Sequence, residues 1–459
     1  MSISLMQAKP EEIDTSEKRG KYTVSVIGCG QTGILAAILF ADAGFKVMCV
    51  DADQTVVNNI AKGKAPFLRS EMESKLKNHA KTGRLGATSD VKEAVSQSDL
   101  IAITIPVKID EKKKADYSEL ENTCKRIGSS LRRGSVVIVM SLTGIGVTEG
   151  LIKETLENTS GLKVGTDFSL AYSPSRTLHG QTLETIISQQ RIVAATDKTS
   201  LNAASNILQS ITKKDLSKTE NMKTAEASAL FEVLHQDVNV AVANELAVLC
   251  EKLGVDYLEA QKLVNADTVN LLSFPMFANG NIQEEPYLLL EDAESLNAKL
   301  RIPNAAREIN EEIVKHAIDL TKDALRNCGK TLRRAKVSLL GVSQTPNSKG
   351  PPKKMAKEIT EMLEARGAKV TLYDPYLSEN EMGEMQPRFK KTLTESVEGA
   401  DCIMILTAHD QFKHLKLGKL KLVMKKPAAI VDLEGIVEPS KIEKEHFIYR
   451  GLGRGVWTK

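Results

Sequence analysis

The sequence predicts an α/β fold, with two doubly wound parallel-sheet domains joined by a long central helix in a helical middle domain. Three observations predict it. Strand and helix patterns alternate up to about residue 200, and they alternate again from residue 335. Between these regions, residues 223–253 contain no Gly or Pro, which is typical of one long helix. The chain has 459 residues, which is too many for a single hydrophobic core.

The first part of the chain predicts an arm and then an α/β domain. Residues 1–21 are polar and show no apolar period, so we expect a flexible arm. Order is expected from Tyr22, and the first α/β domain over residues 22–200. Its predicted elements are a strand from Val24, a helix over residues 34–43, and strands over residues 46–50, 100–104 and 135–140.

The middle of the chain, residues 201–327, predicts a helical domain. A second long helix is expected over residues 305–327. The helix over residues 223–253 has apolar residues on more than one face. We expect these faces to pack against other parts of the protein or against a second chain. A connector between domains and a homodimer interface are both consistent with this pattern, and we expect the homodimer. The apolar positions are Leu230, Val233, Leu234, Val238, Val242, Leu246 and Leu249.

The last region, residues 328–459, predicts a second nucleotide-binding-like α/β domain. Its expected strands cover residues 336–340, 369–373, 401–406 and 429–432, with a helix over residues 353–366. The alternation of strands and helices resembles that of the first domain. Both are therefore expected to be Rossmann-like.

The composition excludes several classes of protein. The 62 Lys and Arg residues nearly balance 59 Asp and Glu residues, and the chain has one Trp, so it lacks a basic or aromatic surface for nucleic acid. No apolar run reaches the roughly 18–20 residues of a membrane span. The six cysteines are dispersed without zinc-ligand spacing, which favours reduced, buried thiols and no metal site. We therefore expect a cytoplasmic protein.

A glycine-rich turn gives the first indication of a ligand. The segment Gly28-Cys29-Gly30-Gln31-Thr32-Gly33 follows a strand and opens a helix, which is the context of a dinucleotide-binding turn. Gly28 permits the tight turn, and Gly30 lets backbone N–H groups approach a pyrophosphate. Gly33 allows the helix to pack closely on the strand. Gln31 and Thr32 lie between these glycines, and the N-terminus of the helix that follows would face the negative charge.

An acidic residue completes this pattern. Asp51 ends the next strand, where a carboxylate accepts hydrogen bonds from the ribose hydroxyls of the adenosine. The carboxylate would repel a 2′-phosphate, and no Arg follows it directly. The cofactor expected at residues 28–33 and 51 is therefore NAD rather than NADP.

Seven segments follow one another along the chain in a characteristic order. They are Val26-Ile-Gly-Cys-Gly-Gln-Thr-Gly33, Ala171-Tyr-Ser-Pro-Ser-Arg176, Asp237-Val-Asn-Val-Ala-Val-Ala-Asn-Glu-Leu246, Cys250-Glu-Lys-Leu-Gly254, Tyr373-Asp-Pro-Tyr376, Thr407-Ala-His-Asp410 and Tyr449-Arg-Gly-Leu-Gly-Arg-Gly455. With these segments the sequence resembles the UDP-glucose/GDP-mannose dehydrogenase family, whose members oxidise the C6 alcohol of a nucleotide sugar to a carboxylate with NAD. The resemblance implies an NAD domain, a homodimer built on the long helix, and a C-terminal domain that holds the nucleotide sugar.

The positions that carry the family's chemistry differ in this chain. The resemblance places the nucleophilic Cys of the family at Asn281, and an amide is not a nucleophile. It places the Lys and Asn that stabilise an oxyanion at Ala229 and Val233, both of which are apolar. The Asp that follows the Cys in the family falls on Glu285.

Two further family positions are also changed. The Glu that follows Ser-Pro in the family is Ser175, and the substrate-binding Arg of the last domain is Pro352. The run from Glu285 to Leu290 resembles the branch of the family that acts on UDP-N-acetylhexosamines. The resemblance thus favours a UDP-sugar ligand in surface-polysaccharide biosynthesis.

These substitutions favour a protein that binds NAD and a nucleotide sugar but has lost the Cys-dependent oxidation to the acid. At most a single or transient hydride transfer would remain, with Glu285 or His235 as its base. A solvated loop acid and a packed helix His are the alternatives for these two residues. Two other functions stay open: a catalytically silent regulator that binds both ligands, and a full dehydrogenase that uses non-standard residues.

Overall fold

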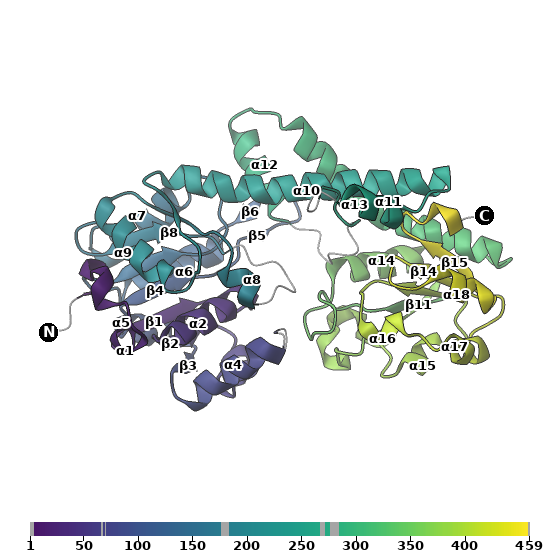
Figure 1. Cartoon of the computed structure of the whole chain (residues 1–459), viewed down its shortest axis with the longest axis horizontal. Coiled ribbons are helices and arrows are strands. Elements are labelled where there is room, and N and C mark those ends of the chain that lie inside the picture. Colours follow the sequence, from purple (N-terminus) through teal and green to yellow (C-terminus); the bar gives the residue numbers. More distant parts are fainter. Residues whose placement is uncertain are drawn as a thin grey trace. The chain divides into compact units, whose positions relative to one another are not determined.

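A computed structural model of the protein describes residues 4–65, 68, 70–175, 183–266, 271–275 and 284–457. The chain forms two compact units. Unit 1 consists of Met1–Val233 with Glu284–Lys299, and unit 2 consists of Leu234–Gln283 with Leu300–Lys459. Figure 1 shows the elements of both units. The division into three domains at residues 200 and 327 stays a prediction.

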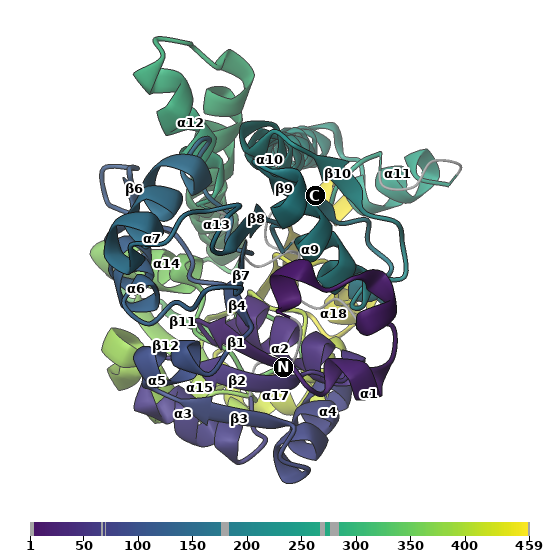
Figure 2. The same cartoon turned by 90° about the vertical axis from the view of Figure 1, so that its left-hand side faces the viewer.

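Unit 1 is built on a sheet of eight strands in the order β10-β9-β8-β7-β4-β1-β2-β3. Neighbouring strands are parallel except β8 and β9, which pair antiparallel. Figure 2 shows the strands following one another in this order. The strands are β1 (Thr23–Ile27), β2 (Lys46–Val50), β3 (Leu85–Thr88), β4 (Leu100–Ile103), β7 (Val136–Val139), β8 (Ser169–Tyr172), β9 (Ile192–Ala195) and β10 (Ser217–Thr219), with a separate pair β5 (Lys108–Ile109) and β6 (Ala115–Asp116).

Helices cover both faces of this sheet, which is why its central strands are apolar throughout. The residues of β4 and β7 are all buried, and they alternate between two hydrophobic clusters on opposite faces. The helices are α2 (Gln31–Ala43), α3 (Gln54–Ala61), α4 (Ser70–Lys81), α5 (Val91–Ser96), α6 (Ser118–Gly128), α7 (Lys153–Ser160), α8 (Leu183–Ile187), α9 (Lys198–Gln209) and α12 (Pro286–Ser295), with a π-helical turn η3 (Thr148–Ile152).

The prediction of a flexible arm over residues 1–21 is wrong for residues 4–21. This segment forms helical turns η1 (Leu5–Gln7) and η2 (Pro10–Glu12) and a short helix α1 (Ser16–Arg19). Leu5 and Ile13 are buried in the core of unit 1, and η1 packs on α9. Arg19 Nε donates to the carbonyl of Ala43 at 2.6 Å. The buried residues are spaced irregularly, so a search for a helix or strand period misses them.

Unit 2 contains a parallel sheet of five strands in the order β12-β11-β13-β14-β15, which confirms the second Rossmann-like fold. Its strands are β11 (Lys336–Leu340), β12 (Lys369–Tyr373), β13 (Cys402–Ile405), β14 (Ala429–Asp432) and β15 (Ile448–Gly451). Its other elements are α11 (Tyr257–Val264), α13 (Arg301–Asn327), α14 (Lys354–Ala365), α15 (Leu393–Val397), α16 (Asp410–Lys413), α17 (Leu417–Val423), α18 (Pro439–Lys444), η5 (Glu379–Glu381), η6 (Gly383–Arg388) and η7 (Gly455–Trp457).

The predicted long helix is confirmed as α10 (Met222–Leu253), which starts in unit 1 and ends in unit 2. Within unit 2, α10 packs on α13 through small and branched apolar side chains. A buried ion pair also joins the two helices, because Arg307 Nη2 lies 2.8 Å from Asp237 Oδ1. Helix α13 starts four residues before the predicted residue 305, since Pro303 is tolerated in a first turn.

None of the described helices is both long and apolar enough to cross a membrane.

Candidate functional site

The glycine turn of unit 1 has the close contacts that its three glycines predict. Gly28 has φ 96°, and a Cβ there would lie 2.8 Å from Ile105 Cδ1. A Cβ on Gly33 would lie 1.9 Å from the carbonyl oxygen of Gly28, so only glycine lets α2 approach β1 this closely. A Cβ on Gly30, by contrast, would have no heavy atom within 4 Å. The turn is therefore packed on its inner side and open at Gly30.

The open space suits the pyrophosphate of a dinucleotide. Gly30 is exposed and forms the N-cap of α2, a helix of 13 residues, and no side chain caps this end by a hydrogen bond. Backbone N–H groups and the helix dipole at such an end favour a negatively charged group. Gln31 and Thr32, the first residues of α2, are partly exposed beside this space.

The carboxylate of Asp51 is held beside the turn by two backbone groups. Cys29 N donates to Asp51 Oδ2 at 2.8 Å, and Asp53 N donates to Asp51 Oδ1 at 2.9 Å. The side chain is partly exposed, and each carboxylate oxygen keeps a further lone pair for a ribose hydroxyl. This arrangement fits the role that the sequence predicts for Asp51.

A threonine that sequence reasoning missed fixes the turn to the neighbouring strand. Thr104 follows β4, and its Oγ1 donates to the carbonyl of Gly28 at 2.6 Å. It also lies 3.0 Å from the carbonyl oxygen of Ile27. Its signal in the sequence is its position at the carboxyl end of the strand next to β1, where an open α/β sheet binds ligands.

A second set of polar contacts orders the loop after β7. The buried carboxylate of Glu226, on α10, accepts from Gly146 N at 2.6 Å and from Thr148 N at 2.9 Å. Burial raises the pKa of Glu226. Asp292, on α12, accepts from Ile145 N at 2.8 Å. The loop is thereby held from two helices of unit 1.

The predicted catalytic positions are divided between the two compact units. On α10, Ala229 is 3% exposed and Val233 is partly buried. Glu285 is exposed and forms the N-cap of α12 in unit 1. His235 is exposed in unit 2, where its Nδ1 lies 3.3 Å from Asn239 Nδ2. Asn281, the predicted position of the family Cys, lies outside the described residues.

The structure also describes Ser175 and Pro352, the other two positions at which the chain differs from the family. Ser175 follows β8 and its N–H donates to the carbonyl of Met140 at 3.0 Å. Pro352 lies in unit 2, where it forms an isolated bridge with Ser343. These two residues therefore belong to different compact units.

Unit 2 has its own glycine turn, at Gly341 after β11. We call it the sealed turn, because the acidic side chain beside it is buried. Asp374 accepts from Val342 N at 2.9 Å and from Ser343 N at 2.8 Å, and its Oδ2 lies 3.1 Å from His409 Nε2. Asp374 and His409 have side chains that are 0% exposed. Burial acts to raise the pKa of Asp374, but the contacts with His409 and the backbone N–H groups outweigh it and leave the pKa below its usual value.

A buried ion pair lies at the same edge of the sheet of unit 2. Lys353 Nζ is 3.3 Å from Glu434 Oε1, and the two side chains are 2% and 3% exposed. Lys353 Nζ also donates to the carbonyl of Leu406. Burial raises the pKa of Glu434 to about 7. Sequence reasoning missed this pair because its members lie 81 residues apart.

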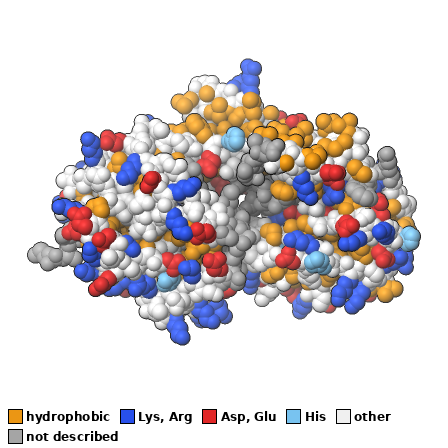
Figure 3. Space-filling view, viewed as in Figure 1, with side chains coloured by type: hydrophobic (Ala, Val, Ile, Leu, Met, Phe, Trp, Pro, Cys, Tyr) orange, Lys and Arg blue, Asp and Glu red, His pale blue; other side chains and the backbone are white. Residues whose placement is uncertain are grey.

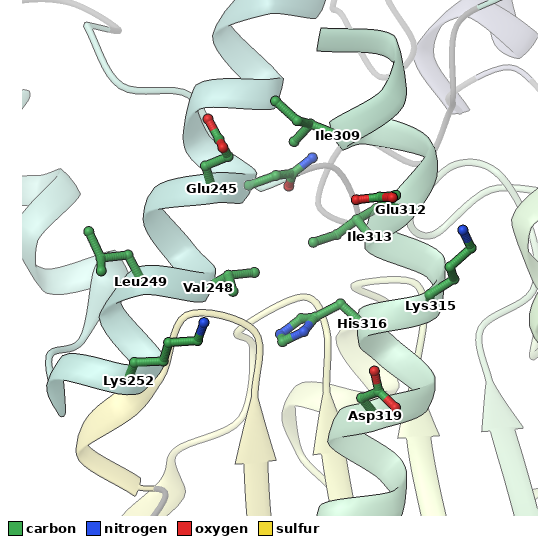
Figure 4. A pocket seen from close by; sticks show the side chains of 11 residues that line it. Glu245, Val248, Leu249, Lys252, Ile309, Glu312, Ile313, Lys315, His316 and Asp319 are labelled. Atoms are coloured by element: carbon green, nitrogen blue, oxygen red, sulfur yellow. The ribbon is translucent and has the colours of Figure 1, made fainter. Parts of the chain in front are cut away.

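A groove of about 490 Å³ runs between α10 and α13 on unit 2. Figure 4 shows its side chains, in which Val248, Leu249, Ile309 and Ile313 form an apolar part and charged residues lie at the rim. Figure 3 shows hydrophobic side chains gathered over this stretch of the surface. The exposed apolar side chains on α10 are Phe231, Val242, Leu249 and Leu253.

Known proteins match this chain along almost its whole length. The NAD binding, central and UDP binding domains of the UDP-glucose/GDP-mannose dehydrogenase family match residues 22–212, 223–312 and 339–439. UDP-N-acetyl-D-mannosamine dehydrogenase of Pyrococcus horikoshii is 30% identical over 435 residues, which cover 94% of this chain and 99% of the relative. UDP-glucose 6-dehydrogenase of Rhizobium meliloti is 25% identical over 447 residues, which cover 94% and 99%.

Solved structures agree with the sequence matches. The structure of UDP-D-ManNAc dehydrogenase from Pyrococcus horikoshii has a TM-score of 0.84 at 29% identity and covers 95% of this chain and 100% of its own. NDP-N-acetyl-D-galactosaminuronic acid dehydrogenase from Methanosarcina mazei Go1 has a TM-score of 0.76 at 27% identity and covers 99% of each chain. These findings confirm the predicted fold and NAD as the cofactor, with a nucleotide sugar as the small-molecule partner. The chain belongs to the UDP-glucose/GDP-mannose dehydrogenase family.

Proposed function

We propose that this protein binds NAD and a UDP-N-acetylhexosamine and does not carry out the Cys-dependent oxidation of the sugar to its acid. The names of several relatives support the sugar class, since they are UDP-N-acetyl-D-mannosamine dehydrogenases. The C-terminal match is described as a UDP binding domain, which supports a UDP-linked ligand.

NAD would be held at the glycine turn of unit 1. In this proposal the pyrophosphate lies over Gly30 and the N–H groups of Gln31, Thr32 and Gly33, and Gly28 forms the turn. Asp51 binds the adenosine ribose. The open space at Gly30 and the anchored carboxylate of Asp51 support this assignment.

The observation that carries the loss of the acid-forming step is the apolar character of α10 at the family's Lys and Asn positions. Ala229 is 3% exposed and brings neither charge nor hydrogen-bond donor to an oxyanion. One preorganised donor contributes roughly 3–4 kcal/mol to such a transition state. Asn281 at the predicted Cys position removes the nucleophile as well.

A single hydride transfer requires fewer groups than the oxidation to the acid. It requires an aligned alcohol, NAD and a proton acceptor. Glu285 is the better candidate for this acceptor, because it is an exposed carboxylate in the same compact unit as the glycine turn. His235 is the second candidate. Its contact with Asn239 and its place in unit 2 support a role on the surface of α10 instead.

The test is the yield of NADH per molecule of nucleotide sugar. Purified protein is incubated with NAD and a panel of UDP-hexoses and UDP-N-acetylhexosamines, and the product mass is measured. We expect one NADH or none per sugar. Two NADH with a mass gain for the acid would contradict the proposal and identify a full dehydrogenase that uses non-standard residues. No NADH with unchanged sugar, but with bound NAD, would identify a catalytically silent regulator.

We also propose that the protein is a cytoplasmic homodimer that pairs through α10. Phe231 and Leu253 on this helix are 57% and 65% exposed, and large apolar side chains at such exposure favour a protein interface. The apolar groove between α10 and α13 extends the same surface. Light scattering should give twice the monomer mass, and Leu249→Asp should give the monomer mass, whereas the exposed Leu422→Asp on α17 should leave the dimer intact.

A further inference from the structure

Residues 411–431 of unit 2 form a segment without acidic side chains. They contain six Lys and one His, and neither Asp nor Glu. Over the whole chain 62 basic residues nearly balance 59 acidic residues, so this balance does not extend to the segment. The segment includes α17, which lies between β13 and β14 in the chain (Figure 1). Its positive charge is therefore a local feature that the overall composition does not show.

Ion pairs neutralise two of the six lysines. Lys413 Nζ lies 2.8 Å from Asp410 Oδ1, and Lys421 Nζ lies 3.3 Å from Glu445 Oε2. The other four lysines are exposed, and within the described residues none of them pairs with an acidic side chain. Neighbouring charges of one sign attract a partner of the opposite sign. The four are Lys416, Lys419, Lys425 and Lys426.

The backbone of Lys425 and Lys426 is fixed to the sheet of unit 2. Lys330 Nζ donates to the carbonyls of Lys425 and Pro427 at 2.9 and 2.6 Å. Lys425 N donates to the carbonyl of Ala400, next to β13, at 3.0 Å. These two exposed lysines therefore lie at a defined place beside the amino-terminal edge of the sheet.

Further positive charge lies near Lys425 at this edge. Burial lowers the pKa of Lys336, the first residue of β11. The charges of Lys390 and Lys425 also act to lower it, whereas Glu398 acts to raise it. Lys336 thus belongs to the same group of neighbouring positive charges, and Glu398 is an acidic member of this edge.

An exposed leucine lies among the unpaired lysines. Leu420 and Val423 attach α17 to a hydrophobic cluster of unit 2, whereas Leu422 is 82% exposed. Lys419 lies one helical turn before Leu422, and Lys425 follows it by three residues. Leu422 therefore contributes little to the core and presents apolar surface to water between positive charges. We call the surface of Lys416, Lys419, Leu422, Lys425 and Lys426 the basic face.

We propose that the basic face binds the surface of a membrane that contains anionic lipids. The lysines contact the phosphates of the headgroups, and Leu422 enters the boundary between the headgroups and the acyl chains. This association is peripheral and places no helix across the bilayer. The inference goes beyond the proposed function and does not depend on which sugar the protein binds.

The chemistry of the basic face favours a membrane over a nucleic acid or an acidic protein. Its cations are all lysines, which act as point charges without the fixed bidentate geometry of arginine, and this suits a fluid layer of headgroups. It has no aromatic side chain on which a base could stack. A protruding leucine beside lysines is typical of segments that lie in a lipid interface.

Co-sedimentation of the full chain with lipid vesicles tests the proposal. The vesicles are phosphatidylcholine alone, or phosphatidylcholine with about a third replaced by phosphatidylglycerol. We expect the partition coefficient to be at least about ten times higher for the anionic vesicles and to fall as the ionic strength rises. Lys425→Glu with Lys426→Glu should lower it at least about tenfold, and Leu422→Ser should lower it about threefold.

Lys62→Glu with Lys64→Glu is the matched control, because it makes the same change of charge at two exposed lysines of unit 1. The control should bind the anionic vesicles as wild type does, and an equal loss in the control would show that only net charge matters and that the inference is wrong. Every variant should keep the NAD affinity of wild type, which separates loss of vesicle binding from unfolding.

The behaviour of wild type can also contradict the proposal. Equal partition into both kinds of vesicle, or no binding to either, would show that the basic face does not recognise anionic lipid. A duplex DNA oligonucleotide and polyglutamate are the competing ligands. If either displaced the protein from anionic vesicles at equal charge concentration, the face would be a site for that polymer and the inference would be wrong. We expect neither to do so, because neither accommodates Leu422.

Discussion

The glycine turn of unit 1 and the glycine turn of unit 2 are built on the same framework. A glycine with positive φ follows the first strand of each Rossmann-like fold, Gly28 at 96° after β1 and Gly341 at 80° after β11. A threonine hydroxyl after the neighbouring strand donates to the carbonyl of that glycine, from Thr104 in unit 1 and Thr407 in unit 2. Each unit also has a buried pair of serines, Ser25 with Ser98 in unit 1 and Ser338 with Ser396 in unit 2. In each unit an aspartate accepts from the N–H of the first strand residue, Asp99 from Thr23 and Asp401 from Lys336.

The two turns differ in the space beside the acidic residue. In unit 1 the second residue after the turn glycine is Gly30, which is exposed and has no neighbour at its Cβ position. In unit 2 the equivalent residue is Ser343, which is buried and contacts His409 Nε2 at 3.1 Å. His409 also contacts Asp374. One framework thus leaves a carboxylate available to a ligand in unit 1 and uses the equivalent carboxylate for packing in unit 2.

The largest effect is expected at the helix glycine of the open turn. Gly33→Ala places a Cβ 1.9 Å from the backbone oxygen of Gly28, which neither residue can avoid. We expect a loss of about 3–5 kcal/mol in the free energy of unfolding and no measurable NAD binding. Chemical denaturation and NAD titration measure the two effects.

Gly30→Ala is the matched control for this variant. Its Cβ meets no atom of the chain, so the free energy of unfolding should change by less than about 1 kcal/mol. NAD affinity should nevertheless fall at least tenfold, because the methyl group occupies the space proposed for the pyrophosphate. Equal NAD affinity in Gly30→Ala and wild type would refute the assignment of the open turn.

The second effect is expected from removing one charge in each turn. Asp374→Asn leaves buried donors without a full set of acceptors and should lower the free energy of unfolding by about 2–4 kcal/mol, with NAD affinity unchanged. Asp51→Asn should raise the Kd for NAD about tenfold with a smaller loss of stability, since Asp51 is partly exposed. If Asp374→Asn changed the NAD affinity and Asp51→Asn did not, the carboxylate that serves NAD would be that of unit 2 and not that of unit 1.

The open turn could be predicted from the sequence, whereas the sealed turn could not. The spacing of Gly28, Gly30 and Gly33 is a local signal, and Asp51 lies at a fixed distance after it. Asp374 and His409 are both in segments that resemble the family, but their contact joins residues 35 apart and depends on how the strands are ordered. The buried residues before Tyr22 and the buried pair of Lys353 and Glu434 were missed for the same reason, because burial is decided by tertiary packing.

The third effect is a pH dependence of stability in unit 2. Burial raises the pKa of Glu434 to about 7 from its ordinary value of 4.5. A carboxyl with a raised pKa contributes most below its unfolded pKa, and this contribution is lost as the pH rises through the folded pKa. We therefore expect wild type to lose about 1–3 kcal/mol relative to Glu434→Gln between pH 5 and pH 8.

Denaturant titrations at both pH values measure this difference. Glu445→Gln is the control, because Glu445 forms a partly exposed pair with Lys421 at 3.3 Å. The control should follow the wild type at both pH values. The same pH dependence in Glu434→Gln would show that another group titrates, and the buried pair with Lys353 would not be its source.

The smallest effect is expected from removing the threonine hydroxyl of each turn. It distinguishes the contacts that both turns share from the binding of NAD. Thr104→Val and Thr407→Val each remove a hydroxyl that donates to the glycine of a turn, at 2.6 Å in unit 1 and 2.8 Å in unit 2. Each variant should therefore lose about 1–2 kcal/mol of unfolding free energy. Only Thr104→Val should also weaken NAD binding, by a few-fold, because only the turn of unit 1 is open to a ligand. If both variants weaken NAD binding equally, the two turns are coupled and the sealed turn has more than a packing role.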